Sequence, residues 1–188
     1  KALKLKQPTL LLIPPTTRQA KVEAINKHPA KGQKYDVSTY KLEDYELWNG
    51  GNEQTENKWR VKIVEGVEDV EADPEITKEG AINYEMAKGY LKKYTDQGLD
   101  VINDADTYLM LMMKGLLDDK PIDQKYWTVL NAKNLTNSSL VAYGRWYGDR
   151  VRLDSVYPDS SSSDLRVRGS VRVMCFALPL TIPRARSE

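Results

Sequence analysis

The stretch NLTNSSLVAYGRWYGDRVRLDSVYPDSSSSDLRVRGSVRV, residues 134–173, decides the fold, and its composition sets it apart from the rest of the chain. Its forty residues contain no Lys, Glu, Gln or Met, whereas all 18 lysines of the chain lie at or before Lys133. An even spread would put about five lysines beyond that point. The stretch instead holds six arginines: Arg145, Arg150, Arg152, Arg166, Arg168 and Arg172. Because surface strands ordinarily mix Lys and Glu with Arg and Asp, something other than solvation selects residues here.

Alternation of apolar and polar residues predicts strands within this stretch. Leu165–Phe176 alternates at period two, which places Leu165, Val167, Val171 and Val173 on one face and Arg166, Arg168 and Arg172 on the other. Two earlier segments, 140–147 and 151–155, show the same pattern and are separated by a Gly148-Asp149 turn signal. Pro158 and the serine-rich run that follows it indicate a loop. We expect an antiparallel sheet with one buried face, including Leu153, Val167, Val171 and Val173, and one face of Tyr, Arg, Asp and Ser.

Two amphipathic helices are predicted upstream of these strands. Asp73 and Pro74 suit the N-cap and first position of a helix reaching Tyr94, and Gly98 stands close to where a C-cap glycine belongs. Asp104–Leu117 forms the second helix, with its apolar residues three and four apart, so that Met112 and Met113 belong to the core. Helices packed on an antiparallel sheet make the predicted fold class α+β.

The first half of the chain gives shorter signals. Leu10–Ile13 is a short strand or a docking arm, and 16–25 has a weak helical period. Residues 58–70 alternate, with Trp59, Val61 and Ile63 on one face and Arg60, Lys62 and Val64 on the other, and 126–130 is a buried strand candidate. We divide the chain into an N-terminal extension, 1–57, which is alternatively part of the same domain, and a main domain, 58–188.

Composition excludes several classes of protein. With 188 residues and a net charge of +1, the chain is long enough for a real core but has no global charge that would favour nucleic acid. No apolar run approaches the roughly 20 residues of a membrane-spanning helix. Cys175 is the only cysteine, which excludes an internal disulfide, and we expect it to be a small buried residue of its strand. The chain begins at Lys1, so a segment upstream of it is an open question.

The sequence offers no convincing catalytic, metal or cofactor site. His28, the only histidine, lies beside Pro29 in a polar region, where a surface residue is the better interpretation than a general base. The carboxylates near the second predicted helix fit helix ends, where they cap or are solvated, better than a cation site: Asp104, Asp106, Asp118 and Asp119. No Gly-rich phosphate loop occurs. We therefore expect no catalytic residues, no metal, no cofactor and no enzymatic activity.

Two passages resemble a known family. AINYEMAKGY (81–90) followed by GLDVINDAD (98–106) resembles the two-helix core of C-type-lectin-fold domains of the formylglycine-generating-enzyme type. GSVRV (169–173) is similar to the closing Gly-x-Val-Arg-Pro strand of that group, with Val173 where Pro is common. The resemblance covers roughly 59–176 and implies a C-type-lectin-like fold with two helices packed on an antiparallel sheet. The enzymes of that group use a reactive cysteine pair, which a lone Cys175 does not provide.

Within that fold, the residue bias resembles that of variable proteins of diversity-generating retroelements. In those families a C-terminal segment is rewritten by adenine-directed mutagenesis, with AAC and AAT codons as favoured targets. Random change at the first two bases of such codons gives Tyr, Ser, Asp, Arg, Gly, Val, Leu and others, but never Lys, Glu, Gln, Met or Trp. The stretch lacks four of those five, contains Trp146 as its only Trp, and has no Asn after Asn137. The resemblance implies a variable region at about 138–168.

The sequence thus predicts a ligand-binding display protein at a virion or cell surface, with a protein or glycan as its macromolecular ligand and no nucleic acid partner. Tyr offers contact area at little entropic cost, Arg forms strong contacts, and Ser, Gly and Asp adapt their hydrogen bonds. Trp146 is a scaffold candidate beneath the contact residues. We expect the ligand to contact nine residues: Tyr143, Arg145, Tyr147, Asp149, Arg150, Arg152, Asp154, Tyr157 and Asp159.

Besides an enzyme, which would require a pocket lined by carboxylates with perturbed pKa values, two alternatives stay open. In the first, Tyr147 or Tyr157 packs in the core and the arginines form an ordinary solvated face. In the second, the chain is a viral or cellular structural subunit that uses the sheet for assembly and shows no diversification.

Overall fold

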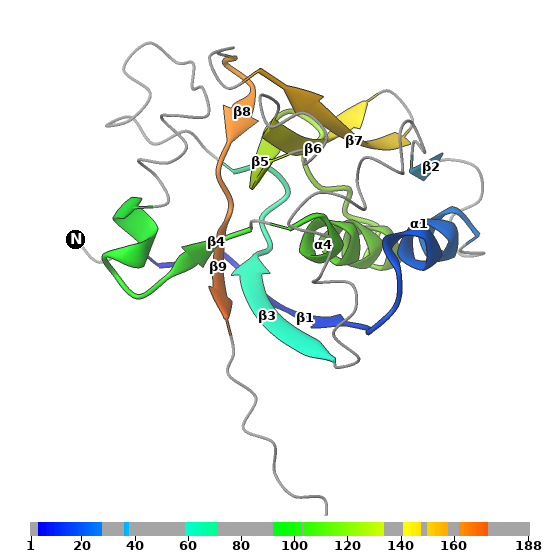
Figure 1. Cartoon of the computed structure of the whole chain (residues 1–188), viewed down its shortest axis with the longest axis horizontal. Coiled ribbons are helices and arrows are strands. Elements are labelled where there is room, and N and C mark those ends of the chain that lie inside the picture. Colours follow the sequence, from blue (N-terminus) through cyan, green and yellow to red (C-terminus); the bar gives the residue numbers. More distant parts are fainter. Residues whose placement is uncertain are drawn as a thin grey trace, which may run out of the picture.

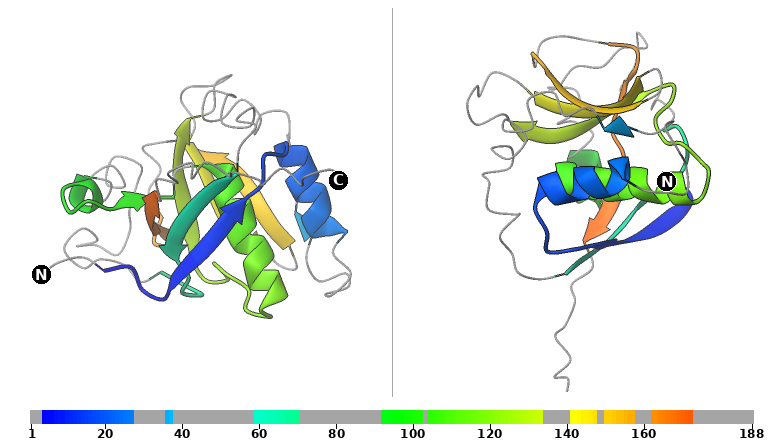
Figure 2. Two further views of the ribbon diagram at one scale, coloured as in Figure 1. Left: turned by 90° about the horizontal axis from the view of Figure 1, so that it is seen from below. Right: turned by 90° about the vertical axis from the view of Figure 1, so that its right-hand side faces the viewer.

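The strands form two β-sheets, and each sheet takes strands from both the first and the second half of the chain. The computed structural model describes residues 4–27, 36–37, 59–70, 92–102, 104–133, 141–147, 150–157 and 162–172. The helices that lie wholly within the described residues are Arg18–Asn26 (α1) and Ala105–Leu117 (α4). Helices α1 and α4 lie between the two sheets (Figures 1 and 2). The strands are Pro8–Ile13 (β1), Asp36–Val37 (β2), Arg60–Glu65 (β3), Asp100–Val101 (β4), Trp127–Lys133 (β5), Val141–Tyr147 (β6), Arg150–Val156 (β7), Leu165–Arg166 (β8) and Gly169–Arg172 (β9). The chain is therefore α+β, as the sequence predicts.

The first sheet has the strand order β1-β3-β9-β4, and all of its pairs are antiparallel. β1 is a strand of this sheet, which decides between the two interpretations of Leu10–Ile13. The second sheet has the order β2-β7-β6-β5-β8, in which β5, β6 and β7 form an antiparallel meander. The edge strands β2 and β8 pair with it in parallel.

Helix α4 lies between the sheets and forms the centre of the core. Asp104 caps it, because its side chain accepts hydrogen bonds from the amide and the hydroxyl of Thr107, both at 2.7 Å. The core joins α4 to both sheets and to α1 through Leu11, Val22, Ile25, Val64, Tyr108, Leu109, Leu111, Met112, Leu116, Leu130, Val151 and Leu153. This confirms the second predicted helix and its core methionine Met112, and it places residues of the N-terminal 27 in the same core.

The first predicted helix falls largely outside the described residues. Its last residues, 92–95, are helical. Gly98 then adopts φ +73° and donates its amide to the Thr95 carbonyl at 3.0 Å, while Leu99 donates to the Tyr94 carbonyl at 3.0 Å. The predicted C-cap glycine is confirmed, since glycine reaches this left-handed conformation without a steric penalty.

The predicted continuous strand Leu165–Phe176 is wrong in its described part. Leu165–Arg166 pairs with β5 in the second sheet, whereas Gly169–Arg172 pairs with β3 and β4 in the first. The chain crosses between the sheets at Val167 and Arg168 (Figure 1). Leu153, Leu165 and Val167 are buried as expected, but Val171 is only half-buried. Val173 and Cys175 lie outside the described residues.

Strand β3 has its charged face inside the molecule. Lys62 and Val64 are buried, while Trp59, one residue before the strand, is 63% exposed. Lys62 donates to the Asp104 carboxylate at 2.6 Å, and Arg60 lies 3.4 Å from Asp106. Asp104 caps α4 as the sequence predicts, but Asp104 and Asp106 are also buried and ion-paired, so neither is a solvated carboxylate. Buried pairing satisfies the charges of both partners. Lys62 therefore shares the inner face with Val64, while Val61 and Ile63 are half-buried on the other face.

Candidate functional site

The strands β5, β6 and β7 present one face toward α4 and one face away from it. Residues directly opposite one another in an antiparallel pair point to the same side of the sheet. Arg145 is opposite Arg152, and Tyr143 is opposite Asp154 and Val129. We call the group that points away from α4 the outer face; it comprises Trp127, Val129, Tyr143, Arg145, Arg152 and Asp154.

An aromatic stack capped by an arginine forms the centre of the outer face. The rings of Trp127 and Tyr143 lie 5.2 Å apart and within 16° of parallel. The Arg145 guanidinium lies 4.3 Å from the Trp127 ring centroid and 5.8 Å from that of Tyr143. A guanidinium over an aromatic face is attracted by the ring quadrupole. The stack therefore holds Arg145 in place as a half-buried cation.

A charged pair borders this stack on β7. Arg152 and Asp154 are half-buried and join through a 3.2 Å contact between Nε and Oδ2. Burial raises the pKa of the Tyr143 hydroxyl, and the negative charge of Asp154 raises it further. Tyr143 therefore presents a neutral hydroxyl, while Arg145 and Arg152 supply positive charge.

The inward face of the same strands is closely packed on α4. Gly144 and Leu153 are opposite one another, and Trp146 is opposite Val151. A Cβ atom at Gly144 would lie 2.1 Å from Cε1 of Tyr108, so the helix approaches the sheet too closely there for any side chain. Trp146 packs against the core, as predicted for a scaffold residue.

The nine predicted contact residues have different positions in the structure. Arg145, Arg152 and Asp154 lie together on the outer face, and Tyr157, just after β7, is 58% exposed. Tyr143 shares that face but is only 6% exposed, because its ring is stacked on Trp127, so the expectation of an accessible Tyr143 is wrong. Tyr147 and Arg150 are strand residues whose side chains are not among those described. Asp149 and Asp159 lie outside the described residues.

Trp127 is a residue of the outer face that the sequence analysis assigned only to a buried strand. The available signal was the alternation of β5, in which Thr128 and Leu130 are the fully buried positions. Close to Trp127, the Arg166 guanidinium lies 4.0 Å from the Tyr126 ring centroid and donates to the carbonyls of Ser163 and Leu165 at 2.6 Å. Arg166 is buried, which corrects its predicted place on an exposed arginine face.

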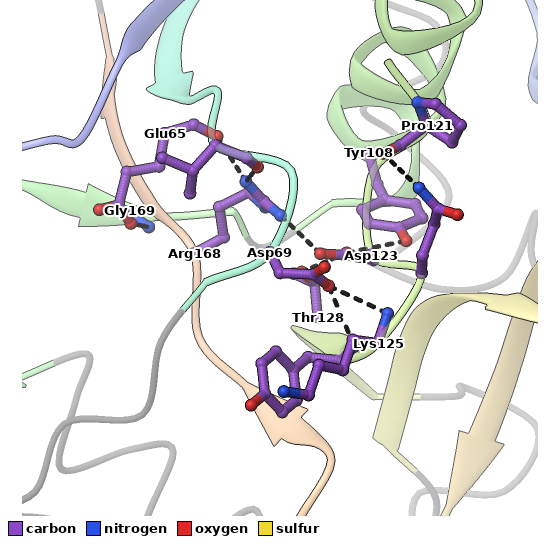
Figure 3. Close-up of polar contacts among 12 residues, drawn as sticks. Glu65, Asp69, Tyr108, Pro121, Asp123, Lys125, Thr128, Arg168 and Gly169 are labelled. Atoms are coloured by element: carbon purple, nitrogen blue, oxygen red, sulfur yellow. Dashed lines mark hydrogen bonds and ion pairs between the residues drawn. The ribbon is translucent and has the colours of Figure 1, made fainter.

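A buried polar cluster joins the two sheets where the chain crosses between them (Figure 3). Arg168, fully buried, contacts the Asp123 carboxylate at 2.5 Å and donates to the carbonyls of Glu65 and Val67 at 2.7 Å. Asp123 also accepts from the Tyr108 and Thr128 hydroxyls at 3.0 and 2.6 Å. Arg168 was expected on an exposed face; instead it is buried, and its donors are satisfied by carbonyls at and just after the end of β3 and by the Asp123 carboxylate between α4 and β5. The cluster is structural in character, since both oxygens of Asp123 and both terminal nitrogens of Arg168 are used within it, although Arg168 Nε has no hydrogen-bond partner among the described residues.

Membrane-spanning helices and metal-binding clusters are both absent from the described part of the chain. No helix in it is long and apolar enough to cross a membrane. Within the same residues, no group of three or more His, Cys, Asp or Glu side chains is arranged to hold a metal ion. No family model, characterised protein or solved structure matches this chain.

Proposed function

We propose that this chain is a ligand-binding display protein that contacts a protein or glycan through the outer face, and that retroelement mutagenesis diversifies this surface. The main supporting observation is the division of β6 and β7 into two faces. Tyr143, Arg145, Arg152 and Asp154 point outward, while Gly144, Trp146, Val151 and Leu153 point toward α4. Apart from the buried Tyr143, the residue types expected from adenine-directed mutagenesis therefore occupy half-buried positions that do not face the core.

A C-type-lectin-like fold is part of the same proposal. It is supported by the resemblance of 81–106 and 169–173, by the helix at 105–117 and by the antiparallel β5-β6-β7 meander. A rigid sheet that presents variable side chains suits recognition, because preorganised strands lose little entropy on binding.

The outer face has the chemistry of a recognition surface. Arg and aromatic residues dominate the binding energy of protein interfaces. Here the rings of Trp127 and Tyr143 are stacked, and the Arg145 guanidinium lies over them. Arg152, opposite Arg145 on β7, adds a second cationic donor beside the stack. A ligand with carboxylates or carbonyl groups matches these donors, since planar guanidinium groups pair with such acceptors.

The packing of β6 and β7 leads us to expect adenine-rich template codons at some positions of these strands and not at others. Gly, Val and Leu are also products of mutated AAC or AAT codons, so composition alone does not separate varied from fixed positions. Packing supports a distinction between them: a side chain at position 144 would meet Tyr108, and Val151 and Leu153 are core residues. We therefore expect adenine-rich template codons at 143, 145, 152 and 154, and none at 144, 146, 151 and 153.

Sequencing the DNA around the gene tests this proposal. The expected result is a near-copy of the DNA for roughly Ser138–Arg168, next to a reverse transcriptase gene and differing almost solely at adenines of the copy. The differences should fall at the outward codons. Absence of such a copy, or differences spread over all four bases or over the inward codons, would contradict diversification.

The structural-subunit alternative makes a different prediction. Such a protein would show no adenine-linked variation, and substitutions on the outer face would impair assembly. Comparing assembly size by light scattering for the unmodified chain and for Arg145→Ala separates the two, because a display protein keeps its oligomeric state when a single contact residue is removed.

A further inference from the structure

The first sheet has an edge strand, β1, whose outer side has no partner among the described strands. The strand order is β1-β3-β9-β4, so β1 pairs with β3 on one side only (Figure 2). On the sheet face that points away from α4, Leu10 is 59% and Leu12 is 55% exposed, whereas Leu11 between them belongs to the core. An edge strand presents unpaired N–H and C=O groups, which are a template for pairing with another strand.

The hydrogen bonds to β3 identify the backbone groups on this outer side. The Gly66 amide donates to the Gln7 carbonyl at 3.0 Å, and these two residues are directly opposite one another when the register of β1 and β3 is extended by one residue. In an antiparallel pair, every second residue bonds to the partner strand. The odd-numbered residues of β1 therefore direct their N–H and C=O groups toward β3, and Leu10 and Leu12 direct theirs outward.

The sequence of this edge lacks the charges that commonly prevent pairing. Residues 7–17, QPTLLLIPPTT, contain no charged side chain, whereas exposed edges are often protected by Lys or another charge. Pro8 and Pro14 stand three residues before and three residues after Leu11. Because proline has no N–H group, pairing ends at both of them. The free edge is therefore short, uncharged and symmetric about Leu11.

We propose that the outer edge of β1 is the interface between two copies of this chain, which pair antiparallel about a two-fold axis at Leu11. In that register Leu10 of one copy is opposite Leu12 of the other, so the outward N–H and C=O groups of both residues bond across the interface. Pro8 is then opposite Pro14, where neither residue offers a donor. A second copy has the complementary edge by construction, as a two-fold interface requires.

Pairing in this register also brings apolar side chains together. Opposite residues of antiparallel strands share a face, so the exposed leucines of the two copies lie side by side on one face of the joined sheet. Behind them on β3, Ile63 is opposite Leu10 and Val61 is opposite Leu12, and both are half-buried. Removing the leucines from water favours association. The inference is independent of the proposed ligand-binding function, which concerns the other sheet.

Sedimentation velocity of the full chain tests the proposal. One strand per copy contributes less than the roughly 800 Å² per partner of a standard interface, so the dimer should be reversible. The sedimentation coefficient should rise from that of a monomer to that of a dimer between about 1 μM and about 1 mM. Leu12→Lys places a charge beside Leu10 of the second copy and should raise the dissociation constant by about tenfold or more.

The matched control is Leu117→Lys at the end of α4, because Leu117 is as exposed as Leu12, at 55%. This variant should dimerise like the unmodified chain. Far-UV circular dichroism checks that both variants fold. A chain that stays monomeric at every concentration, or a dimer that Leu12→Lys weakens no more than Leu117→Lys does, would overturn the proposal.

Amide hydrogen exchange measured by NMR shows whether β1 is the interface. The Leu10 and Leu12 amides should exchange rapidly in the dilute monomer and about tenfold or more slowly in the dimer, because only the second copy bonds to them. The Leu11 amide, bonded to β3, should exchange slowly in both states. Protection of Leu10 and Leu12 in the monomer would show that another part of the chain occupies the edge. Rapid exchange at all concentrations would exclude a second copy there, and either result overturns the proposal.

Discussion

Buried charge is concentrated where β3 meets the start of α4, and single residues there have several partners. Asp104 caps the helix through Thr107 and accepts from Lys62, while Arg60 lies 3.6 Å from its other oxygen. Burial on its own would raise the pKa of the Asp104 carboxyl. The charges of Lys62 and Arg60 and the hydrogen bonds from Lys62 and Thr107 outweigh burial, so the pKa lies below the ordinary value of 3.8.

Replacing this one charge should destabilise the fold in a pH-dependent way. Asp104→Asn keeps a good helix cap but leaves Lys62 buried without its anion, which should lower the free energy of unfolding by about 3 kcal/mol at pH 7. A lowered carboxyl pKa stabilises the fold above the unfolded-state pKa, and this contribution is lost as pH falls through the folded-state pKa. Urea unfolding from pH 7 to pH 3 should therefore show the difference between the two proteins narrowing below about pH 4.

The exposed pair of Lys92 and Asp96 provides the control for this measurement. Their contact of 2.7 Å is close to the 2.6 Å between Lys62 and Asp104, but both side chains are exposed. Asp96→Asn should change the free energy of unfolding by less than about 0.5 kcal/mol. A loss equal to that of Asp104→Asn would show that burial is not the cause.

Among the elements, the β6–β7 pair has the strongest contrast between its two faces. Every second residue faces α4, and the close approach at Gly144 leaves no room for a side chain. The alternate residues contact one another across the outer face through the Trp127 stack and the Arg152–Asp154 pair. A single hairpin thus combines fixed and replaceable positions, which is the property that the proposed function requires.

Two neighbouring substitutions test this contrast. Gly144→Ala places a Cβ against the Tyr108 ring and should destabilise by about 1–3 kcal/mol, since overpacking forces backbone or ring shifts. Arg152→Ala, on the adjacent strand, should cost less than about 1 kcal/mol because its ion pair is half-exposed. Thermal unfolding of both variants gives the comparison. Equal losses would mean that the two faces are equally constrained and would count against a diversified surface.

At the scale of the whole molecule, residues 165–172 contribute one strand to each sheet, β8 to the second and β9 to the first. β8 ends at Arg166 and β9 begins at Gly169, and the fully buried Arg168 between them bonds to Asp123 and to the carbonyls of Glu65 and Val67. These partners come from the end of β3 and from the segment between α4 and β5. Arg168 therefore couples the sheets as well as filling space between them.

Removing that coupling should destabilise the entire fold. Arg168→Met fills a similar volume but leaves the Asp123 carboxylate buried without its cation, at a cost of about 3–5 kcal/mol. Adding Asp123→Asn should recover part of the loss, because the uncompensated charge is gone. Urea unfolding of both single variants and the double variant measures the coupling. Independent, additive losses would show that Arg168 and Asp123 do not act as a pair.

The sequence by itself determined the local features of this protein. Asp104 was recognisable as a helix start because an acidic residue preceded a run of regularly spaced apolar residues, and Gly98 was recognisable as a helix end. The strands β6 and β7 followed from their alternation. These features depend on backbone propensity and on side chains a few residues apart, so they are fixed before any distant segment meets them.

Only the tertiary structure decided which faces are inside. Alternation in β3 separated Lys62 from Val61, but it did not reveal that the Lys62 face is the buried one, because the partner Asp104 lies 42 residues away. In the same way, Arg168 is buried because of Asp123, 45 residues before it, and the predicted continuous strand divides between two sheets at that point. A strand pattern specifies two different faces, whereas the burial of a charge depends on a partner brought close by the fold.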